Sequence, residues 1–155
     1  MILTLQQLAG TISRLKSEQK KIVTTNGVFD ILHTGHIRYL AEAKKMGDVL
    51  IVGLNSDAST RALKGETRPI NKESDRAEVL DALGMVDYVI IFDELDPRKL
   101  LEQIKPHAHV KGGDYTIDRI IEKDVVEAGG GIVVLLDASP GYATTNIIKK
   151  ILKRD

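Results

Sequence analysis

Two histidines three positions apart are the most informative chemical feature of this sequence. His33 and His36 flank Gly35 in the segment NGVFDILHTGH, which spans residues 26–36 and directly follows a β-branched run. If a helix starts here, both imidazoles can point the same way and donate hydrogen bonds to one phosphate group. A helix start also offers unpaired backbone N–H groups and the positive end of the helix dipole. Gly35 lets the backbone approach a ligand closely. The segment therefore predicts phosphate chemistry.

The histidine pair has two other interpretations. Each histidine could be an ordinary core or surface residue, and together they could be half of a metal site. The sequence has no cysteine, and no carboxylate lies one helical turn from both histidines. We therefore expect no metal site built from protein side chains. The lack of cysteine also excludes disulfides and thiolate catalysis.

A second group of polar residues follows the second predicted strand. Asn55, Ser56 and Asp57 come first, and four basic residues follow within a short distance, namely Arg61, Lys64, Arg68 and Arg76. Such a stretch is either a solvated loop or a lid that closes over phosphates.

Two further segments lie after later strands. In KGGDY, residues 111–115, the glycine pair allows close backbone approach and Asp114 could accept hydrogen bonds from hydroxyl groups. A simple turn explains this segment equally well. In GYATTN, residues 141–146, Thr144 and Thr145 open a predicted helix, where they could cap it, bind phosphate oxygens, or do both.

Short apolar runs alternate with helical patterns along the chain. Strands are predicted at residues 21–25, 49–54, 88–92, 108–110 and 132–136, and helices at 5–17, 37–46, 73–83, 97–104, 117–128 and 144–152. Continuous apolar strands between helices predict an α/β fold, a Rossmann-like, doubly wound parallel sheet of five strands with helices on both faces. Such a sheet binds ligands where its winding reverses, here between strands 21–25 and 108–110.

Composition limits the class of protein. The 155 residues fit one domain, residues 1–155, with a helix in residues 1–20 that precedes the core. Lys and Arg total 22, as do Asp and Glu, so the net charge of zero argues against a nucleic-acid or membrane-surface partner. Neither a signal peptide nor an apolar run of roughly 20 residues is present, so we expect a cytoplasmic protein.

The segment NGVFDILHTGH resembles the HxGH signature of the cytidylyltransferase-like superfamily of nucleotidyltransferases, and the likeness extends from Lys21 to Lys150. The resemblance implies that His33 and His36 contact a nucleoside triphosphate and stabilise charge on its α-phosphoryl group. It implies that Lys64 and Arg76 hold the phosphates, so these four are the expected catalytic residues. It also implies Mg²⁺ on the nucleotide phosphates.

The same resemblance implies the remaining site residues. The residues expected to bind the nucleotide are Asn26, Gly27, Phe29, Gly35, Lys111, Gly113, Asp114, Thr144 and Thr145. Those expected to bind the acceptor are Asp30, Asn55, Asp57 and Arg68. Asp30 could alternatively orient the first histidine.

Several segments indicate which branch of the superfamily is nearest. NSDAST, LKGETRP, VKGGDY and TTNIIKKI resemble the D-glycero-β-D-manno-heptose 1-phosphate adenylyltransferases of ADP-heptose biosynthesis, which serves lipopolysaccharide. One departure is Ala143, where those enzymes usually have serine. The resemblance implies ATP and a sugar 1-phosphate as substrates, and a homodimer.

Two alternatives stay open. The first is a CTP-dependent cytidylyltransferase for glycerol phosphate or a similar small alcohol phosphate. Those enzymes carry an Arg-Thr-Glu-Gly-type segment before the last helix, whereas ASPG, residues 138–141, has no arginine. The second is a non-catalytic nucleotide-binding module, which the intact histidine pair disfavours.

Overall fold

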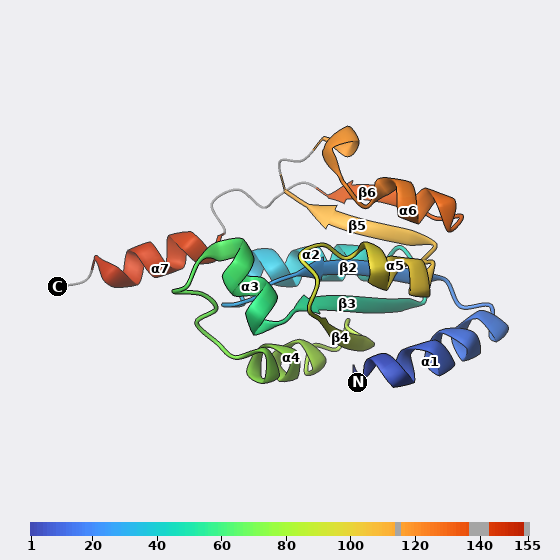
Figure 1. Cartoon of the computed structure of the whole chain (residues 1–155), viewed down its shortest axis with the longest axis horizontal. Coiled ribbons are helices and arrows are strands. Elements are labelled where there is room, and N and C mark those ends of the chain that lie inside the picture. Colours follow the sequence, from blue (N-terminus) through green and yellow to red (C-terminus); the bar gives the residue numbers. More distant parts are fainter. Residues whose placement is uncertain (114–115, 137–142, 154–155) are drawn as a thin grey trace.

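A parallel sheet forms the centre of the molecule (Figure 1). The computed structural model describes residues 1–113, 116–136 and 143–153. Within these ranges the sheet has six strands in the order β1-β4-β3-β2-β5-β6, and every neighbouring pair is parallel. The strands are Ile2–Leu3 (β1), Ile22–Gly27 (β2), Val49–Asn55 (β3), Tyr88–Phe92 (β4), Ala108–Gly112 (β5) and Ile132–Leu136 (β6).

The predicted α/β fold is confirmed, with one strand more than the five expected. The extra strand, β1, pairs with β4 through Ile2↔Val89 and Leu3↔Ile90. Two residues are too few to show a strand pattern, so only the neighbouring strand reveals it. The central strands are covered on both faces, as their continuous apolar sequences predicted, and all seven residues of β3 are buried.

The winding reverses between β2 and β5, as predicted. From β2 the chain proceeds to β3 and β4 on one side, and β5 and β6 lie on the other. The two strands pair at Val23↔Ala108 and Thr24↔His109. Beyond these pairs β2 runs on beside β3, and β5 runs on beside β6. The carboxyl ends of β2 and β5 therefore border the crevice in which such sheets bind ligands.

The helices are Leu5–Ser17 (α1), Thr34–Lys44 (α2), Asp57–Lys64 (α3), Glu73–Asp81 (α4), Arg98–Ile104 (α5), Lys123–Ala128 (α6) and Thr144–Leu152 (α7). The sequence did not predict α3. Ser56 caps its start by accepting a hydrogen bond from the Ser59 N–H at 3.2 Å, and Gly65 ends it with φ of 96°.

The helix predicted at residues 117–128 is divided. Ile117–Arg119 forms a short 3₁₀ helix (η1), the backbone is extended at Ile120 (φ −83°, ψ 106°), and α6 begins at Lys123 after a turn. Ile120 is 5% exposed and Glu122 is 2% exposed, whereas Ile121 between them is 60% exposed. A continuous helix would turn residues two apart to different sides, and the extended backbone of Ile120 interrupts the helix at this point.

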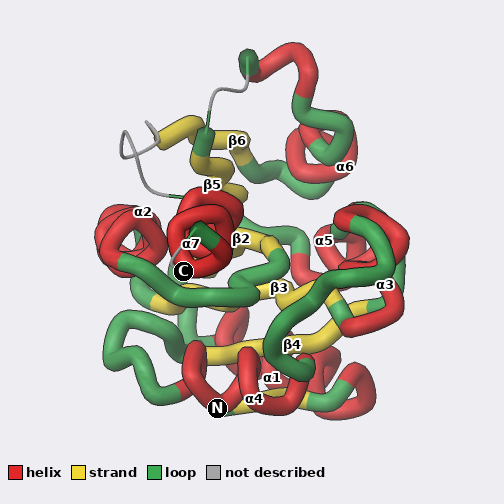
Figure 2. Tube along the Cα trace, turned by 90° about the vertical axis from the view of Figure 1, so that its left-hand side faces the viewer, coloured by secondary structure: helices red, strands yellow, loops and turns green. Residues whose placement is uncertain are grey.

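Two apolar layers cover the sheet. On one face Leu40 and Ala43 of α2 and Leu80 of α4 pack against the strands. On the other face the buried residues of α1 and α5, such as Leu8 and Ile104, form a second cluster. Figure 2 shows α2 and α5 on opposite sides of β2 and β3. α7 extends away from the sheet, and none of its described residues is buried (Figure 1).

Candidate active site

The two histidines lie at the start of α2. His33 is the N-cap residue, with an extended backbone (φ −145°, ψ 170°), and its side chain makes no capping hydrogen bond. The imidazole rings of His33 and His36 stack, with centroids 3.8 Å apart and planes 22° from parallel. The Phe29 ring lies 5.2 Å from that of His36. The helix start therefore holds both imidazoles together beside its first-turn backbone amides.

The surroundings of the pair favour neutral imidazoles. Burial, with a smaller contribution from neighbouring His33, lowers the pKa of His36 to about 4. Burial also lowers the pKa of His33. Among the described residues, the buried Nδ1 atom of His36 has no hydrogen-bond partner. Because a buried polar atom without a partner is costly, a polar ligand at this position would stabilise the site.

Phe29 has an unusual backbone beside this pair. Its φ is +45°, in the left-handed region that a bulky side chain rarely adopts. The ring is buried, and a Cβ atom added at Gly27 would lie 2.9 Å from it. Gly27 therefore leaves the room that Phe29 needs to pack against His36, and backbone outliers of this kind are concentrated at functional sites.

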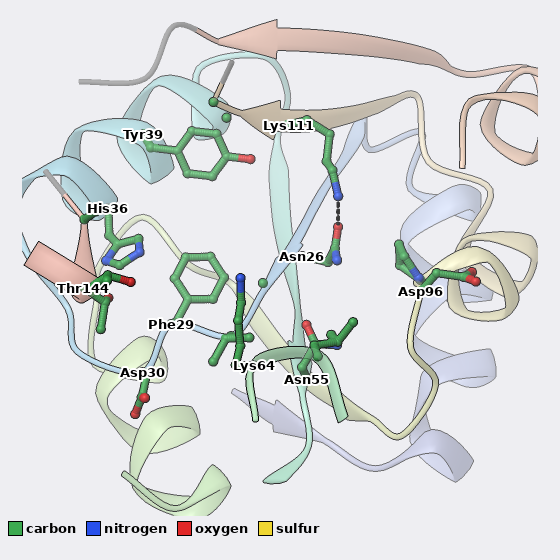
Figure 3. Close-up of a pocket in the computed structure, with 18 of the residues that line it drawn as sticks. Asn26, Phe29, Asp30, His36, Tyr39, Asn55, Lys64, Asp96, Lys111 and Thr144 are labelled. Atoms are coloured by element: carbon green, nitrogen blue, oxygen red, sulfur yellow. Dashed lines mark hydrogen bonds between the residues drawn. The ribbon is translucent and has the colours of Figure 1, made fainter. Parts of the chain in front are cut away.

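A cavity of about 750 Å³ opens at the carboxyl ends of the strands. Most of the predicted site residues line it, namely Asn26, Gly27, Phe29, Asp30, His33, Gly35, His36, Asn55, Lys64, Arg68, Lys111, Gly113, Thr144 and Thr145. Figure 3 shows His36 and Thr144 on one side of it and Asp96 on the other. Asp114 lies outside the described residues.

The start of α7 lies beside the start of α2. The Thr144 hydroxyl donates a hydrogen bond to the Ile31 carbonyl oxygen at 3.2 Å. The N-cap residue of α7 is Ala143, which has no side chain that could cap the helix. Two helix starts without a side-chain cap therefore border the same cavity, an arrangement suited to an anion.

Arg76 does not reach the cavity, contrary to the expectation that it holds phosphate. Its side chain is 1% exposed, and its guanidinium donates to the carbonyl oxygens of Asn71, Val28 and Asn55 at 3.0, 2.6 and 2.9 Å. It also pairs with the Asp57 carboxylate at 2.8 Å. These bonds occupy the guanidinium, so it joins the ends of β2 and β3 to α3 and α4. Asp57, expected to bind the acceptor, pairs with Arg76 and does not line the cavity.

Asp30 also has a structural role within the protein. Its carboxylate accepts hydrogen bonds from the Ile70 and Asn71 backbone N–H groups, each at 2.9 Å, and from Arg68 Nε at 2.6 Å. Burial alone would raise the pKa of Asp30, but these bonds outweigh it and the pKa is lowered. The carboxylate therefore fixes the segment after α3. Its side chain is 0% exposed.

Several cavity residues were not predicted. Tyr39 binds the Thr25 hydroxyl at 2.5 Å and the Val110 carbonyl oxygen at 2.7 Å, so it joins α2 to β2 and β5. Glu122 and Asp96 add carboxylates to the wall. Nothing in the local sequence distinguishes these residues from ordinary core or surface positions. The single sequence signal for Tyr39 is its spacing, because it follows His36 by three positions and so lies on the same side of the helix.

The described residues contain no group of three or more His, Asp or Glu side chains placed to hold a metal ion. Among the same residues, no helix is long and apolar enough to cross a membrane.

The chain is similar to a protein family and to several known proteins. A family model described as cytidylyltransferase-like matches residues 24–149. The chain is 56% identical over 152 residues to the bifunctional protein HldE of Geobacter metallireducens, covering 98% of this chain and 31% of that protein. It is 55% identical over 133 residues to the HldE of Campylobacter concisus, covering 86% of this chain and 27% of that protein. The chain thus spans about a third of the length of these relatives.

Two solved structures are similar as well. One is a lipopolysaccharide core biosynthesis protein from Thermoplasma volcanium, with a TM-score of 0.64 and 36% identity, covering 77% of this chain and 97% of that one. The other is the pantoate-β-alanine ligase from Francisella tularensis, with a TM-score of 0.67 over 100% of this chain and 80% of that one. At 19% identity, the second similarity concerns the fold alone.

Proposed function

The chain belongs to the cytidylyltransferase-like family of nucleotidyltransferases, and we propose that it transfers AMP from ATP to D-glycero-β-D-manno-heptose 1-phosphate, with ADP-heptose and pyrophosphate as products. The observation that carries this proposal is the stacked histidine pair at the start of α2, inside a cavity large enough for a nucleotide. The choice of acceptor rests on the likeness to HldE proteins and to a lipopolysaccharide core biosynthesis protein.

In the proposed reaction, a phosphate oxygen of the sugar 1-phosphate attacks the α-phosphorus of ATP. A new P–O bond forms on the side opposite the leaving group, the bond from the α-phosphorus to the oxygen bridging to the β-phosphorus breaks, and pyrophosphate departs with the electron pair. Because such transfers need little covalent help, the protein contributes positioning and electrostatic stabilisation.

The residues proposed for this work come from different elements. His33 and His36 donate hydrogen bonds to the α-phosphoryl oxygens, and the first-turn amides around Gly35 add further donors. Lys64, an exposed cation at the end of α3, lines the same cavity and attracts the departing pyrophosphate. Thr144 and Thr145 supply donors from the start of α7.

Mg²⁺ enters this proposal as part of the nucleotide substrate. The ion usually binds phosphate oxygens and water with only one or two protein carboxylates. The described lining of the cavity includes the Asp96 carboxylate but no cluster of metal-binding side chains, which fits a metal carried by the nucleotide better than a cage of protein ligands. Bound there, it would neutralise phosphate charge.

The deciding experiment measures pyrophosphate release with Mg²⁺ while crossing two nucleotides with two acceptors. ATP and CTP are each combined with heptose 1-phosphate and with glycerol 3-phosphate. We expect release only from ATP with the heptose phosphate. Release from CTP with glycerol phosphate would retain the reaction type and replace both substrates.

If folded protein that binds nucleotide releases no pyrophosphate in any of the four combinations, the proposed substrates are contradicted. The same assay with His36→Ala then serves as the background control. Binding of ATP without turnover for any sugar phosphate would favour a nucleotide-binding module.

A further inference from the structure

Five polar side chains form a continuous hydrogen-bonded network between β2, β5 and the start of α6. The Thr24 hydroxyl lies 2.8 Å from His109 Nδ1, and His109 Nε2 lies 3.3 Å from Glu122 Oε1. Lys111 Nζ lies 2.6 Å from the same Glu122 oxygen. It also donates a hydrogen bond to Asn26 Oδ1 at 2.9 Å (Figure 3). Thr24, His109 and Glu122 are buried, whereas Lys111 and Asn26 lie at the crevice between β2 and β5.

The chemistry of these groups fixes the direction of every bond. A lysine ammonium only donates, and an ionised carboxylate only accepts. Burial by itself would raise the pKa of Glu122, but the His109 hydrogen bond and the Lys111 charge hold it at about 2. Burial also lowers the pKa of His109, which is therefore neutral. His109 must then donate through Nε2 to Glu122 and accept at Nδ1 from the Thr24 hydroxyl.

The last bond of the network orients Asn26. Because Lys111 can only donate, the Asn26 carboxamide must turn its oxygen toward the ammonium. Its NH₂ group, with two hydrogen-bond donors, is then turned away from Lys111, and Asn26 lines the cavity at the end of β2. A single buried carboxylate thus determines which side of the Asn26 amide a ligand meets.

The charge balance at this place differs from that near the histidines. Glu122 compensates the charge of Lys111, so the pair is close to neutral, whereas Lys64 is an exposed cation. The cavity also contains the apolar side chains of Leu95 and Ile121, each 60% exposed. Donors beside apolar surface suit an uncharged ring that carries acceptor atoms better than they suit a phosphate group.

We propose that Glu122 is a positioning residue that orients Lys111 and, through it, the Asn26 amide to bind the nucleoside part of the nucleotide. This proposal rests on the proposed nucleotidyl transfer. It assigns recognition of the base and ribose to the β2–β5 crevice, and it leaves the phosphates to the starts of α2 and α7. Glu122 itself touches no reacting atom in this arrangement.

The test compares Glu122→Gln with Glu127→Gln, a matched change of an exposed carboxylate on α6. Glu127 pairs with Lys123 at 4.0 Å, away from the network. Calorimetric titrations with adenosine and with ATP report binding without turnover. In Glu122→Gln we expect Kd to rise for both ligands by the same factor, roughly tenfold, as for the loss of one or two well-aligned hydrogen bonds. We expect no change in Glu127→Gln.

Steady-state kinetics separate a role in nucleotide binding from a purely structural role, because a purely structural role would not change the KM for ATP alone. We expect the KM for ATP to rise in Glu122→Gln about as much as Kd does, roughly tenfold. The KM for the sugar phosphate and kcat should stay within about twofold, since the network serves only nucleoside binding. Thermal melting confirms that each variant is folded.

A second variant, Asn26→Asp, tests the proposal if Glu122→Gln does not fold. Asn26→Asp keeps an oxygen for Lys111 and presents an acceptor to the ligand in place of the NH₂ donors. We expect it to weaken adenosine binding at least as much as Glu122→Gln. Adenosine carries no phosphate, so repulsion between carboxylate and phosphate does not contribute.

Three results would overturn the proposal. These are weaker binding of ATP without weaker binding of adenosine, a change confined to the KM of the sugar phosphate, and variants that match the wild type. Failure of the proposed function gives a different result, in which the wild type binds nucleosides but releases no pyrophosphate. If the wild type uses CTP, cytidine and CTP replace adenosine and ATP in the titrations.

Discussion

At the scale of single residues, the site depends on how burial and neighbouring groups set charge and direction. Burial lowers the pKa of His33 and of His36 and so favours neutral imidazoles, although the ligand proposed for this pair is an anion. Arg76 and Asp30, in contrast, are charged groups whose hydrogen bonds are already used within the protein. Residue type alone does not show which situation applies, because an ionisable side chain of any kind can bind either a ligand or other groups of the protein.

The first prediction concerns His36 as a donor to the transferred phosphoryl group. Replacement with alanine should lower kcat by about 10²–10³-fold, as for the loss of one preorganised donor. The variant should still fold, with at most a modest fall in the melting temperature, because the substitution removes ring contacts with Phe29 and His33 together with a buried nitrogen that has no partner among the described residues. Turnover close to that of the wild type would contradict the mechanism.

The second prediction concerns the pH dependence of stability. The pKa of His36 falls from 6.5 to about 4 in the folded protein, so between these values the unfolded chain binds more protons. The contribution of His36 to the free energy of unfolding is therefore complete above pH 6.5 and decreases as the pH falls toward 4. Urea titrations of the wild type and His36→Gln across this range should show the free energy of unfolding of the wild type falling relative to that of the variant as the pH is lowered. A constant difference would mean that His36 titrates normally.

At the scale of elements, loops and helix starts are held in place by a few polar contacts. Asp30 fixes the segment after α3, Arg76 joins the ends of β2 and β3 to α4, and Thr144 attaches the start of α7 near α2. α7 has no buried residue among those described, and this hydrogen bond is one of its contacts with the rest of the chain. The cavity is consequently shaped by contacts between elements that are far apart in the sequence.

The third prediction tests the structural role of Arg76. Arg76→Met removes buried hydrogen bonds to three carbonyl groups and one carboxylate, and should lower the free energy of unfolding by at least about 2 kcal/mol. Arg61→Met, the same change at an exposed position of α3, should have little effect. Unchanged stability together with lost ATP binding would instead support the phosphate role expected from the sequence. Urea unfolding and calorimetry provide the two measurements.

The fourth prediction concerns the N-cap of α7. Ala143 has the extended backbone of an N-cap residue (φ −152°, ψ 141°) without a capping side chain. Ala143→Ser should stabilise the helix by about 1 kcal/mol, which slows amide hydrogen exchange in α7 about fivefold in the ligand-free protein. Ala143→Val, which cannot cap, should not slow it. Equal exchange in all three proteins would show that α7 gains nothing from a cap.

At the scale of the whole molecule, two apolar layers and one reversal of winding create the site. The reversal places β2 beside β5, and the cavity opens at their carboxyl ends. The N-terminal segment belongs to this architecture, because β1 extends the sheet and Leu8, Ile12 and Leu15 of α1 lie in the core. It is therefore part of the fold and does not merely precede it.

The fifth prediction tests this integration of α1. Leu8 is 0% exposed, so Leu8→Ala should lower stability by about 3 kcal/mol. For a chain of this length the melting temperature should fall by roughly 6–12 °C. Gln6→Ala, at an exposed position of the same helix, should melt like the wild type. A small effect of Leu8→Ala would mean that α1 is dispensable for folding.

The sequence by itself determined the α/β class, most elements and the position of the crevice. Continuous apolar runs of five to seven residues are decisive because parallel strands are buried on both faces. The histidine pair was equally informative, since its spacing and its place at a helix start are local properties.

The tertiary structure decided what depends on distant neighbours. β1 exists as a strand through its pairing with β4, and the break between η1 and α6 follows from burying both Ile120 and Glu122. Whether Arg76 and Asp30 face a ligand or the protein depends on which carbonyl, amide and charged groups surround them in space. The same holds for the network around Glu122, because its members belong to segments that meet only when β2 and β5 pair.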